Sequence, residues 1–340
     1  MVSLLPNPDQ LQLVESVTGF LAAELPLARL HAADPAAGEA RAWQAMADLG
    51  WFGLNIDEDL GGSGLGLAES ALIFRAFGRH LLSPSVLATA IAARLAAQAG
   101  RPDLLTALLA GKSRAAIAQA RGGAVIGKES DGGFWLIDAA VADWIVLWDD
   151  RGVALLQKAA FTLAAPEAGL DWTLALQKGE LNKGAATIWA GDQAALLARQ
   201  ANLLVTAMLV GVSEGARDMG VAYAKVREQF GQPIGAFQAV KHHCANMAVL
   251  SEAAWAQTAY SAVRETEGQD AGFDITAARI LAADAAIRNG ETNIQVHGGI
   301  GFTADADPHL FVKRAHLLNQ VGGDLRHHQR RLLAEPNAAV

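Results

Sequence analysis

Cysteine is almost absent from this sequence of 340 residues, which contains only Cys244. A single cysteine cannot build a disulfide framework, so the chain is not a small disulfide-stabilised secreted domain. A reducing compartment is the natural setting for such a chain, and we expect a cytoplasmic protein. Because free cysteines are commonly buried and Cys244 lies in a stretch with apolar periodicity, we expect a buried structural thiol.

An excess of positive charge is also lacking. Lys and Arg total 27 against 35 Asp and Glu, which gives a formal net charge of −8. Nucleic-acid binding depends on basic surfaces, so we expect no nucleic-acid partner. The first stretch, "MVSLLPNPDQLQLVESVTGFLAAELPL", has acidic residues and early prolines but no basic region, which argues against a signal peptide. No run of about 18 uncharged apolar residues stands out, so we predict no membrane span.

Apolar residues are abundant, at 52% of the chain, and most are Ala and Leu. Ala and Leu favour helices, so a mainly helical protein with a large core is expected. Helical periodicity dominates both ends of the chain, whereas short apolar runs separated by Gly, Asp and Ser indicate strands in the middle. We therefore predict an N-terminal helical domain, a small middle β-domain and a C-terminal four-helix bundle, at residues 1–111, 112–190 and 191–340 respectively.

The C-terminal part contains the longest helical pattern, which begins near Asp192 and is expected to stop at Gly231, with Pro233 just beyond. A second helix is predicted from about Phe237 past Val263. A third is expected over 273–298, and a last one after Pro308.

One candidate site surrounds the predicted helix stop, in "REQFGQPIGAFQ" (227–238). Arg227 would lie in the last turn of the long helix, where any cation is favourable. Two flat rings, Phe230 and Phe237, and the planar amide of Gln238 accompany it. Such a turn can simply join two helices, or it can hold a phosphate with an attached flat ring.

A second candidate site is "QVHGGIGF" (295–302), in which Gln295 ends a predicted helix and Gly298 and Gly299 follow. Backbone amides of a glycine turn can hold a pyrophosphate. A glycine helix cap followed by a loop explains the same residues equally well. Either motif alone is weak evidence for a ligand site.

Taken together, the two motifs resemble those of the acyl-CoA dehydrogenase family. The resemblance extends to "LGWFGLNIDEDLGGSGLGLAESALIFRAFGR" and to "DPHLFVKRA". It is strong over 45–85 and 210–325 and poor between them. It implies a fold with an N-terminal helical domain, a small β-barrel and a C-terminal four-helix bundle, in agreement with the periodicity.

The resemblance also implies a cofactor, FAD, bound across a subunit interface. Family members use an Arg, a Phe and a Gln of the first motif to reach a neighbouring subunit's FAD. The residues that match are Arg227, Phe230 and Gln238 in the first motif and Gln295, Gly298 and Gly299 in the second. We predict FAD binding for these residues and for Gln229. The reaction implied is α,β-dehydrogenation of an acyl-CoA thioester, with electron-transferring flavoprotein as the acceptor.

The family's catalytic Glu is missing from both of its usual positions. Gly322 takes the place of the Glu in the loop after "KRA", and Ala201 takes the place used by members that carry it on the long helix. Asp324 could replace the loop Glu only if the loop were shifted. Glu214 and Asp218 lie on the long helix, where we expect solvated or inter-helix polar roles.

The middle domain departs from the family as well. Members usually have a Thr-Glu-Pro segment and a Trp-containing strand that hold the flavin ring. Here the first region reads "AIAQARGGAVIG", and the second strand is missing between "GFWLID" and "AAVADWIVLW". The middle domain is therefore interpreted as a reduced β-barrel. Trp135, Trp144 and Trp148 remain, and we expect them to pack in the sheet core.

These departures favour one hypothesis among three. The chain resembles the short, non-catalytic type of subunit of bacterial α2β2 steroid or acyl-CoA dehydrogenases, which completes a partner's FAD site. One alternative is a self-sufficient homo-oligomeric enzyme, a homotetramer for example, with Asp324 or another carboxylate as the base. The other is a flavin-free structural partner subunit.

Two further clusters carry less information. His242, His243 and His297 have no carboxylate or Cys at ligand spacing, so no metal site is predicted. The basic stretch "DLRHHQRR" (324–331) fits a terminal helix, and also fits contact with FAD or CoA phosphates.

Overall fold

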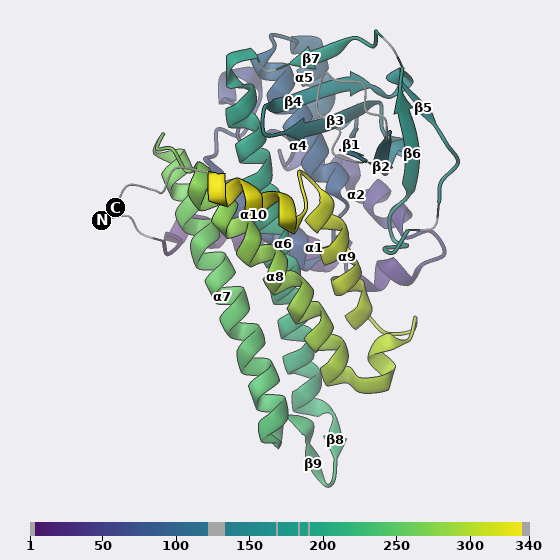
Figure 1. The fold of residues 1–340 in the computed structure, drawn as a ribbon, viewed down its shortest axis with the longest axis vertical. Helices are drawn as coiled ribbons and strands as arrows, with labels where there is room; N and C mark the ends of the chain where they lie inside the picture. Colours follow the sequence, from purple (N-terminus) through teal and green to yellow (C-terminus); the bar gives the residue numbers. More distant parts are fainter. Residues whose placement is uncertain (1–3, 122–132, 168, 183, 190, 335–340) are drawn as a thin grey trace. The chain divides into compact units, whose positions relative to one another are not determined.

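The N-terminal part of the chain is helical in the computed structural model, which describes residues 4–121, 133–167, 169–182, 184–189 and 191–334 (Figure 1). Asn7 forms a capping box with Gln10, and Ser83 caps the helix that Pro84 begins, so local chemistry sets these helix starts. The elements are α1 (Pro8–Glu24), η1 (Leu27–His31), α2 (Ala36–Asp48), η2 (Glu58–Leu60), α3 (Leu67–Arg79), α4 (Pro84–Gln98) and α5 (Pro102–Leu109).

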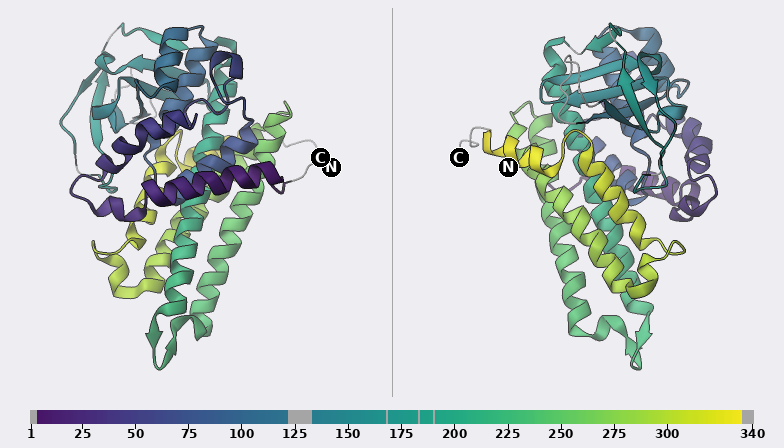
Figure 2. Two further views of the ribbon diagram at one scale, coloured as in Figure 1. Left: turned by 180° about the vertical axis from the view of Figure 1, so that it is seen from behind. Right: turned by 45° about the vertical axis from the view of Figure 1, so that its right-hand side comes forward.

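The middle of the chain forms a sheet with the strand order β5-β6-β2-β1-β3-β4-β7. The strands are β1 (Ala115–Ala120), β2 (Phe134–Ile137), β3 (Trp144–Asp149), β4 (Gly152–Gln157), β5 (Phe161–Leu163), β6 (Leu176–Leu181) and β7 (Thr187–Trp189), with the short helices η3 (Ala139–Val141) and η4 (Lys158–Ala160). The pair β1–β3 is parallel and the other described pairs are antiparallel. The sheet curls on itself (Figure 2).

The C-terminal part returns to helices. Its elements are η5 (Gly191–Gln193), α6 (Ala194–Val226), β8 (Glu228–Gln229), β9 (Gln232–Pro233), η6 (Ile234–Ala236), α7 (Gln238–Thr266), α8 (Gly272–His297), η7 (Gly298–Phe302), α9 (Pro308–Gln320) and α10 (Leu325–Ala334). Helices α6, α7, α8 and α9 run side by side (Figures 1 and 2), and we call them the helical bundle.

The chain divides into two compact units, each with its own core. One unit comprises Ala32–Ser70 and Leu82–Asn202, and the sheet in it buries Phe134, Leu136 and Phe161 on one face.

The other unit comprises Met1–His31, Ala71–Leu81 and Leu203–Val340. In it α3 and α6 approach closely, because a Cβ atom on Gly211 would lie 1.9 Å from the Arg75 carbonyl oxygen, and one on Gly78 would lie 2.0 Å from that of Met208.

The predicted fold class, with N-terminal helices, a small middle β-domain and C-terminal helices, is confirmed. The domain boundaries after residues 111 and 190 stay predictions. Two details were wrong. The long helix ends at Val226, before a β-hairpin, and the segment after Pro308 forms two helices instead of one. In both places consecutive residues with positive φ turn the chain, namely Phe230 and Gly231 in the first and Gly322 and Gly323 in the second.

The tryptophans of the middle domain divide between two environments. Trp148 is buried, and its Nε1 donates a hydrogen bond to Asn202 Oδ1 at 3.1 Å. Trp135 and Trp144 are half-buried. Cations of Arg121 and Lys178 lie over the Trp135 ring, so core packing describes Trp148 better than it describes Trp135. The segment "AIAQARGGAVIG", where the family has Thr-Glu-Pro, lies partly outside the described residues.

In the described part of the chain, two helical segments are long and apolar enough to cross a membrane by length and composition alone. In Ala194–Val226, 83% of the most apolar window is buried, as in the core helix of a globular unit. In Pro8–His31, near the N-terminus, 17% of that window is buried. The expected absence of a membrane span therefore stays a prediction.

Candidate functional site

The first motif forms a tight β-hairpin at one end of the bundle. Gln229 pairs with Gln232, and between them Phe230 (φ +53°) and Gly231 (φ +78°) both lie in the left-handed region. Positive φ at both central residues is the mark of the turn that best fits a two-residue hairpin. The Ile234 N–H closes the hairpin by donating to the Arg227 carbonyl at 2.7 Å. Arg227 thus lies one residue beyond α6 and begins the hairpin.

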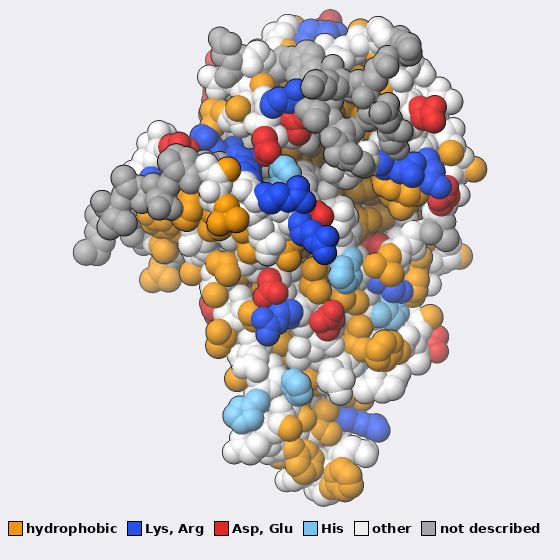
Figure 3. All heavy atoms as spheres, viewed as in Figure 1, with side chains coloured by type: hydrophobic (Ala, Val, Ile, Leu, Met, Phe, Trp, Pro, Cys, Tyr) orange, Lys and Arg blue, Asp and Glu red, His pale blue; other side chains and the backbone are white. Residues whose placement is uncertain are grey.

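The candidate side chains of this motif point into solvent. Arg227, Gln229 and Gln238 are exposed, and Phe230 is 93% exposed. Phe230 contacts Phe237 edge to face, with ring centroids 6.1 Å apart. Hydrophobic side chains gather at this end of the helical bundle in Figure 3. We call this end, which carries the hairpin of residues 227–234 and the turn of Gly298 and Gly299, the tip. A side chain as apolar as Phe230, placed on a positive-φ turn and left in water, indicates a binding surface more than a structural role.

The second motif caps helix α8. Gly298 has φ +66°, and its N–H donates to the carbonyls of Gln295 and Ile294. The Gln295 side chain is exposed. A Cβ atom added to Gly298 or to Gly299 would meet no atom within 4 Å, so both glycines border open space. The glycine cap predicted from the sequence is therefore present, and its outer side is free to receive a ligand.

The two motifs lie at the same end of the bundle. Val296 of α8 packs in one small apolar cluster with Ala224 of α6 and Met247 of α7, and Ile234 of η6 lies against it. Tyr223 of α6 stacks on His297 of α8, with ring centroids 4.1 Å apart. Neither ring was singled out for this role by the sequence. Tyr223 lies one turn before Arg227 and His297 immediately before Gly298, and this proximity to the two motifs is the sequence signal that could have identified them.

This end of the bundle fits a phosphate-containing cofactor. It combines an exposed guanidinium, an exposed aromatic ring and a glycine turn that no side chain covers. Guanidinium groups bind phosphate oxygens through paired N–H donors, and glycine turns admit close approach of a pyrophosphate. The described residues thus offer the donor types that FAD requires. The assignment of Arg227, Phe230 and Gly298 to FAD stays a prediction.

Of the three positions predicted for a base, two carry no carboxylate, and the carboxylate of the third, Asp324, caps a helix. Gly322 is buried with φ +73°, and Ala201 is buried on α6. Asp324 caps helix α10, because its Oδ1 accepts the His327 N–H at 2.8 Å. The loop that would have to shift for Asp324 to act as a base is thus fixed by a helix start.

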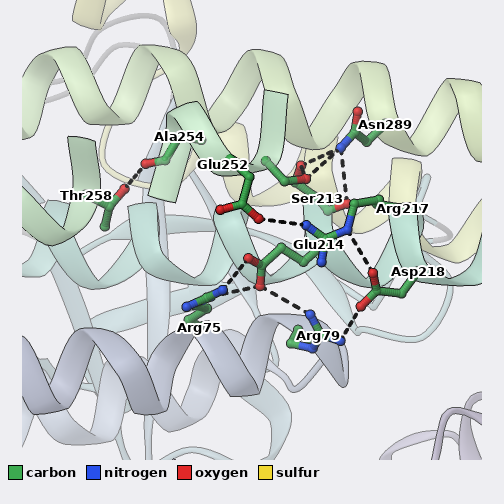
Figure 4. Close-up of polar contacts among 11 residues, drawn as sticks. Arg75, Arg79, Ser213, Glu214, Arg217, Asp218, Glu252, Ala254, Thr258 and Asn289 are labelled. Carbon is green, nitrogen blue, oxygen red and sulfur yellow. Dashed lines mark hydrogen bonds and ion pairs between the residues drawn. The ribbon is translucent and has the colours of Figure 1, made fainter. Parts of the chain in front are cut away.

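Glu214 is buried at the centre of an ion-pair cluster between α3 and α6 (Figure 4). Arg75 binds it with two N–H groups, one of them at 2.8 Å from Oε2, and Arg79 Nη1 lies 3.3 Å from the same oxygen. The expectation of an inter-helix polar role is met, whereas solvation is wrong for Glu214, whose side chain is 0% exposed. A carboxylate held by two cations is poorly suited to abstract a proton.

Asp218 belongs to the same cluster. Burial alone would raise the pKa of its carboxyl group, but hydrogen bonds from Arg217 and Arg79 outweigh burial and hold the pKa below its ordinary value. Arg217 is bound in turn to Glu252 at 3.2 Å. Both acidic residues of α6 are therefore part of a structural network.

Replacing Glu214 with Ala is expected to destabilise the protein by about 3–5 kcal/mol, because Arg75 would lose its buried carboxylate partner and Arg79 would keep only Asp218. Urea unfolding followed by circular dichroism measures this change. Glu252→Ala is the matched control, since the Glu252 side chain is 67% exposed in its pair with Arg217, and pairs with an exposed partner contribute about 0.2–1 kcal/mol. Equal losses in the two variants would contradict the interpretation of Glu214.

Acid is expected to destabilise the fold through three histidines. Burial lowers the pKa of His80, His297 and His309 from the ordinary 6.5, so the native state takes up protons less readily than the unfolded chain. The resulting stability is full above pH 6.5 and is lost as the pH falls through the native-state pKa values. Thermal unfolding between about pH 7.5 and about pH 5.5 should show a falling Tm. His297→Phe should keep the stack on Tyr223 and reduce the dependence of Tm on pH. An unchanged dependence would show that His297 does not contribute to the acid destabilisation.

The remaining sequence expectations concern single clusters. Among the residues that the structure describes, no group of His, Cys, Asp or Glu could hold a metal ion. Cys244 is half-buried beside the apolar cluster at the tip, instead of fully buried, and burial raises the pKa of its thiol. The basic stretch forms α10, with Arg326 and Arg330 exposed.

Comparison with known proteins identifies the class. Residues 7–111 match the family described as "Acyl-CoA dehydrogenase, N-terminal domain", and residues 196–335 match "Acyl-CoA dehydrogenase, C-terminal domain". The chain belongs to the acyl-CoA dehydrogenase family.

Particular relatives are found among mycobacteria. Acyl-CoA dehydrogenase IpdE2 of Mycolicibacterium smegmatis is 33% identical over 294 residues, which cover 86% of this chain and 87% of that protein. Acyl-CoA dehydrogenase FadE34 of Mycobacterium tuberculosis is 33% identical over 315 residues, which cover 89% of this chain. The chain spans only 44% of the length of FadE34.

Solved structures show the same fold. The ChsE4-ChsE5 complex from Mycobacterium tuberculosis matches with a TM-score of 0.84 and 24% identity, covering 99% of this chain and 100% of that chain. Butyryl-CoA dehydrogenase from Megasphaera elsdenii matches with a TM-score of 0.78 and 18% identity, covering 98% and 99% respectively.

Proposed function

We propose that this chain is the subunit of a FAD-dependent acyl-CoA dehydrogenase that completes a partner subunit's FAD site and does not supply the catalytic base. The family assignment supports the reaction class, α,β-dehydrogenation of an acyl-CoA thioester. The observation that carries the subunit role is a contrast between two places. The candidate FAD-binding side chains are exposed, whereas Gly322 has no carboxylate and the carboxylate of Asp324 caps helix α10.

Bound FAD supplies the acceptor for the hydride that leaves the β-carbon of the substrate. The part of this chain in that chemistry is binding and orientation. Arg227 neutralises phosphate charge through its guanidinium, and Phe230 packs against a flat ring of the cofactor or of its site. The Gln295 amide meets the adenosine portion, and Gly298 and Gly299, which have no side chain, let the pyrophosphate approach the backbone closely. Gln229 and Gln238 add planar amides at the rim of the same site.

The partner follows from this division of labour. A second acyl-CoA dehydrogenase subunit carries the Glu that removes the α-proton, and the two kinds of chain form an α2β2 heterotetramer. The ChsE4-ChsE5 complex, which shares this fold, supports a two-chain assembly. Electron-transferring flavoprotein takes the electrons, and the complex works in the cytoplasm. A formal net charge of −8 supports the absence of a nucleic-acid partner.

Absorbance spectra test the proposal. The chain is purified alone, and then together with a co-expressed acyl-CoA dehydrogenase subunit that retains the Glu. We expect no flavin absorption from the chain alone. Flavin should appear in the complex, and an acyl-CoA substrate should bleach it.

Three outcomes distinguish the alternatives. Flavin bound to the chain alone and bleached by an acyl-CoA would establish a self-sufficient homo-oligomer and overturn the proposal. A complex that forms without flavin would identify a structural subunit. Flavin in the complex alone supports the proposal.

A further inference from the structure

A single side chain ties together the three helices that lead to the candidate site. Asn289 of α8 is fully buried, and its Nδ2 lies within hydrogen-bonding distance of oxygens on two other helices. On α6 these are Ser213 Oγ at 2.8 Å and Ser213 O at 3.3 Å. On α7 they are Met247 O and Ser251 Oγ, each at 2.9 Å. Figure 4 shows Asn289 reaching toward Ser213.

The two serines also bind each other, so α6 and α7 are linked directly as well as through Asn289. Ser213 Oγ and Ser251 Oγ lie 2.9 Å apart. The three side chains form a polar layer (Ser213, Ser251, Asn289) in an otherwise apolar core. None of the three side chains is exposed. Buried polar contacts of this kind depend on direction, whereas apolar contacts tolerate sliding, so a polar layer can fix the axial register of packed helices.

All three helices run from this layer to the two motifs. Helix α6 continues from Ser213 to the hairpin of Arg227, and α7 begins at Gln238, before Met247. Helix α8 continues from Asn289 to Gln295 and the turn of Gly298. The α8 turns that precede Asn289 bury four alanines, Ala282, Ala283, Ala285 and Ala286, which contribute no large side chain to hold the register. A slip of one turn, about 5.4 Å, would separate the two motifs.

We propose that Asn289 is a positioning residue for the cofactor site, which fixes the register of α6, α7 and α8 so that Arg227 and the Gly298–Gly299 turn face one ligand together. This inference rests on the proposed function for the identity of the ligand. The register itself is a property of the chain alone, and can be measured without flavin.

The chain contains its own control. Asn293 lies one turn further along α8 and is likewise fully buried. Unlike Asn289, it has a side-chain amide whose Nδ2 and Oδ1 both lack a hydrogen-bond partner among the residues that the structure describes. Leucine has the same branched shape but is larger, and it carries no polar atom, so Asn289→Leu and Asn293→Leu make the same chemical change at adjacent turns. Only the first removes bonds between helices.

Amide hydrogen exchange of the chain alone measures how well the backbone hydrogen bonds of the first motif are protected, and this protection depends on the register of the helices. The Arg227 N–H donates to Tyr223 O at 2.9 Å, and the Ile234 N–H closes the hairpin. In Asn289→Leu we expect both amides to exchange at least about tenfold faster, while core amides of α9 keep their protection. In Asn293→Leu we expect the tip amides to be unchanged.

The outcomes separate positioning from simple stabilisation. Unchanged tip exchange in Asn289→Leu overturns the inference. A uniform rise across the whole unit also overturns it, because it reports a loss of global stability. If Asn289→Leu does not fold, the same exchange measurement is made on Ser251→Ala, which removes one acceptor of the Asn289 amide on α7. A selective rise at the tip then supports the inference, and no change overturns it.

Flavin provides the second readout. In the complex with the partner subunit, Asn289→Leu should retain at least about tenfold less flavin than Asn293→Leu, whereas equal retention overturns the link to the site. If the wild-type complex binds no flavin, the proposed function fails, while the exchange result still tests the register.

Discussion

Replacing Arg227 with Ala is expected to remove FAD from the assembled complex without dissociating the two subunits. The guanidinium is exposed at the start of the hairpin, and among the described residues no carboxylate forms an ion pair with it. In the complex its charge would be opposed by phosphate oxygens. Losing one partner of a desolvated charge pair costs about 2–5 kcal/mol, which corresponds to a fall in FAD affinity of at least about thirtyfold. The ratio of flavin to protein after gel filtration measures this loss.

Two further variants make the test specific. Lys225→Ala removes an exposed cation two positions earlier, in the last turn of α6, and should leave the flavin content unchanged. Arg227→Lys keeps the charge but loses the paired N–H donors, so we expect it to retain less flavin than wild type and more than Arg227→Ala. Equal flavin loss in Lys225→Ala and Arg227→Ala would show that net charge, not a specific contact, governs binding.

The fold was largely predictable from the sequence because periodicity and turn residues report local structure directly. The end of α6 was not. Arg227-Glu228-Gln229 continues a helical pattern, so the sequence predicts a turn at Gly231, and only tertiary packing explains why the helix already ends at Val226. A Cβ atom on Gly235 would lie 2.8 Å from the Ala224 carbonyl oxygen, so the returning chain lies directly on α6. That contact favours a hairpin at Phe230 over another helical turn.

The polar residues of the core were harder to interpret than the motifs. Glu214 reads as one acidic residue on an amphipathic helix, and its role depends on Arg75 and Arg79 of α3, far away in the sequence. Asn289 carries no sequence signal at all, because its partners lie on two other helices. Spacing along one chain predicts which face of a helix is apolar, but not which buried polar groups meet.

Asp324→Asn is expected to leave turnover of the complex within about twofold of wild type, because the Asp324 carboxylate serves as a helix cap and not as a base. Asparagine caps helices about as well as aspartate, so this change removes the charge while keeping α10 in place. Asp324→Ala should instead cost about 1 kcal/mol of stability, again with turnover retained. Steady-state reduction of an artificial electron acceptor measures turnover, and thermal unfolding measures the cap.

The partner subunit supplies the contrast that makes this prediction decisive. Changing its catalytic Glu to Gln should lower turnover by about 10²–10⁴-fold, the usual contribution of a positioned base. A comparable fall in Asp324→Asn would place the base in this chain. Gly322→Glu should not restore a base in the chain alone. Gly322 has φ +73°, a conformation that costs side-chain-bearing residues about 1–2 kcal/mol, and it is followed by Gly323 at φ +114°. The loop is therefore a glycine turn that leads into the α10 cap. A glutamate at position 322 would be strained by the positive φ, so we do not expect it to place its carboxylate correctly for catalysis.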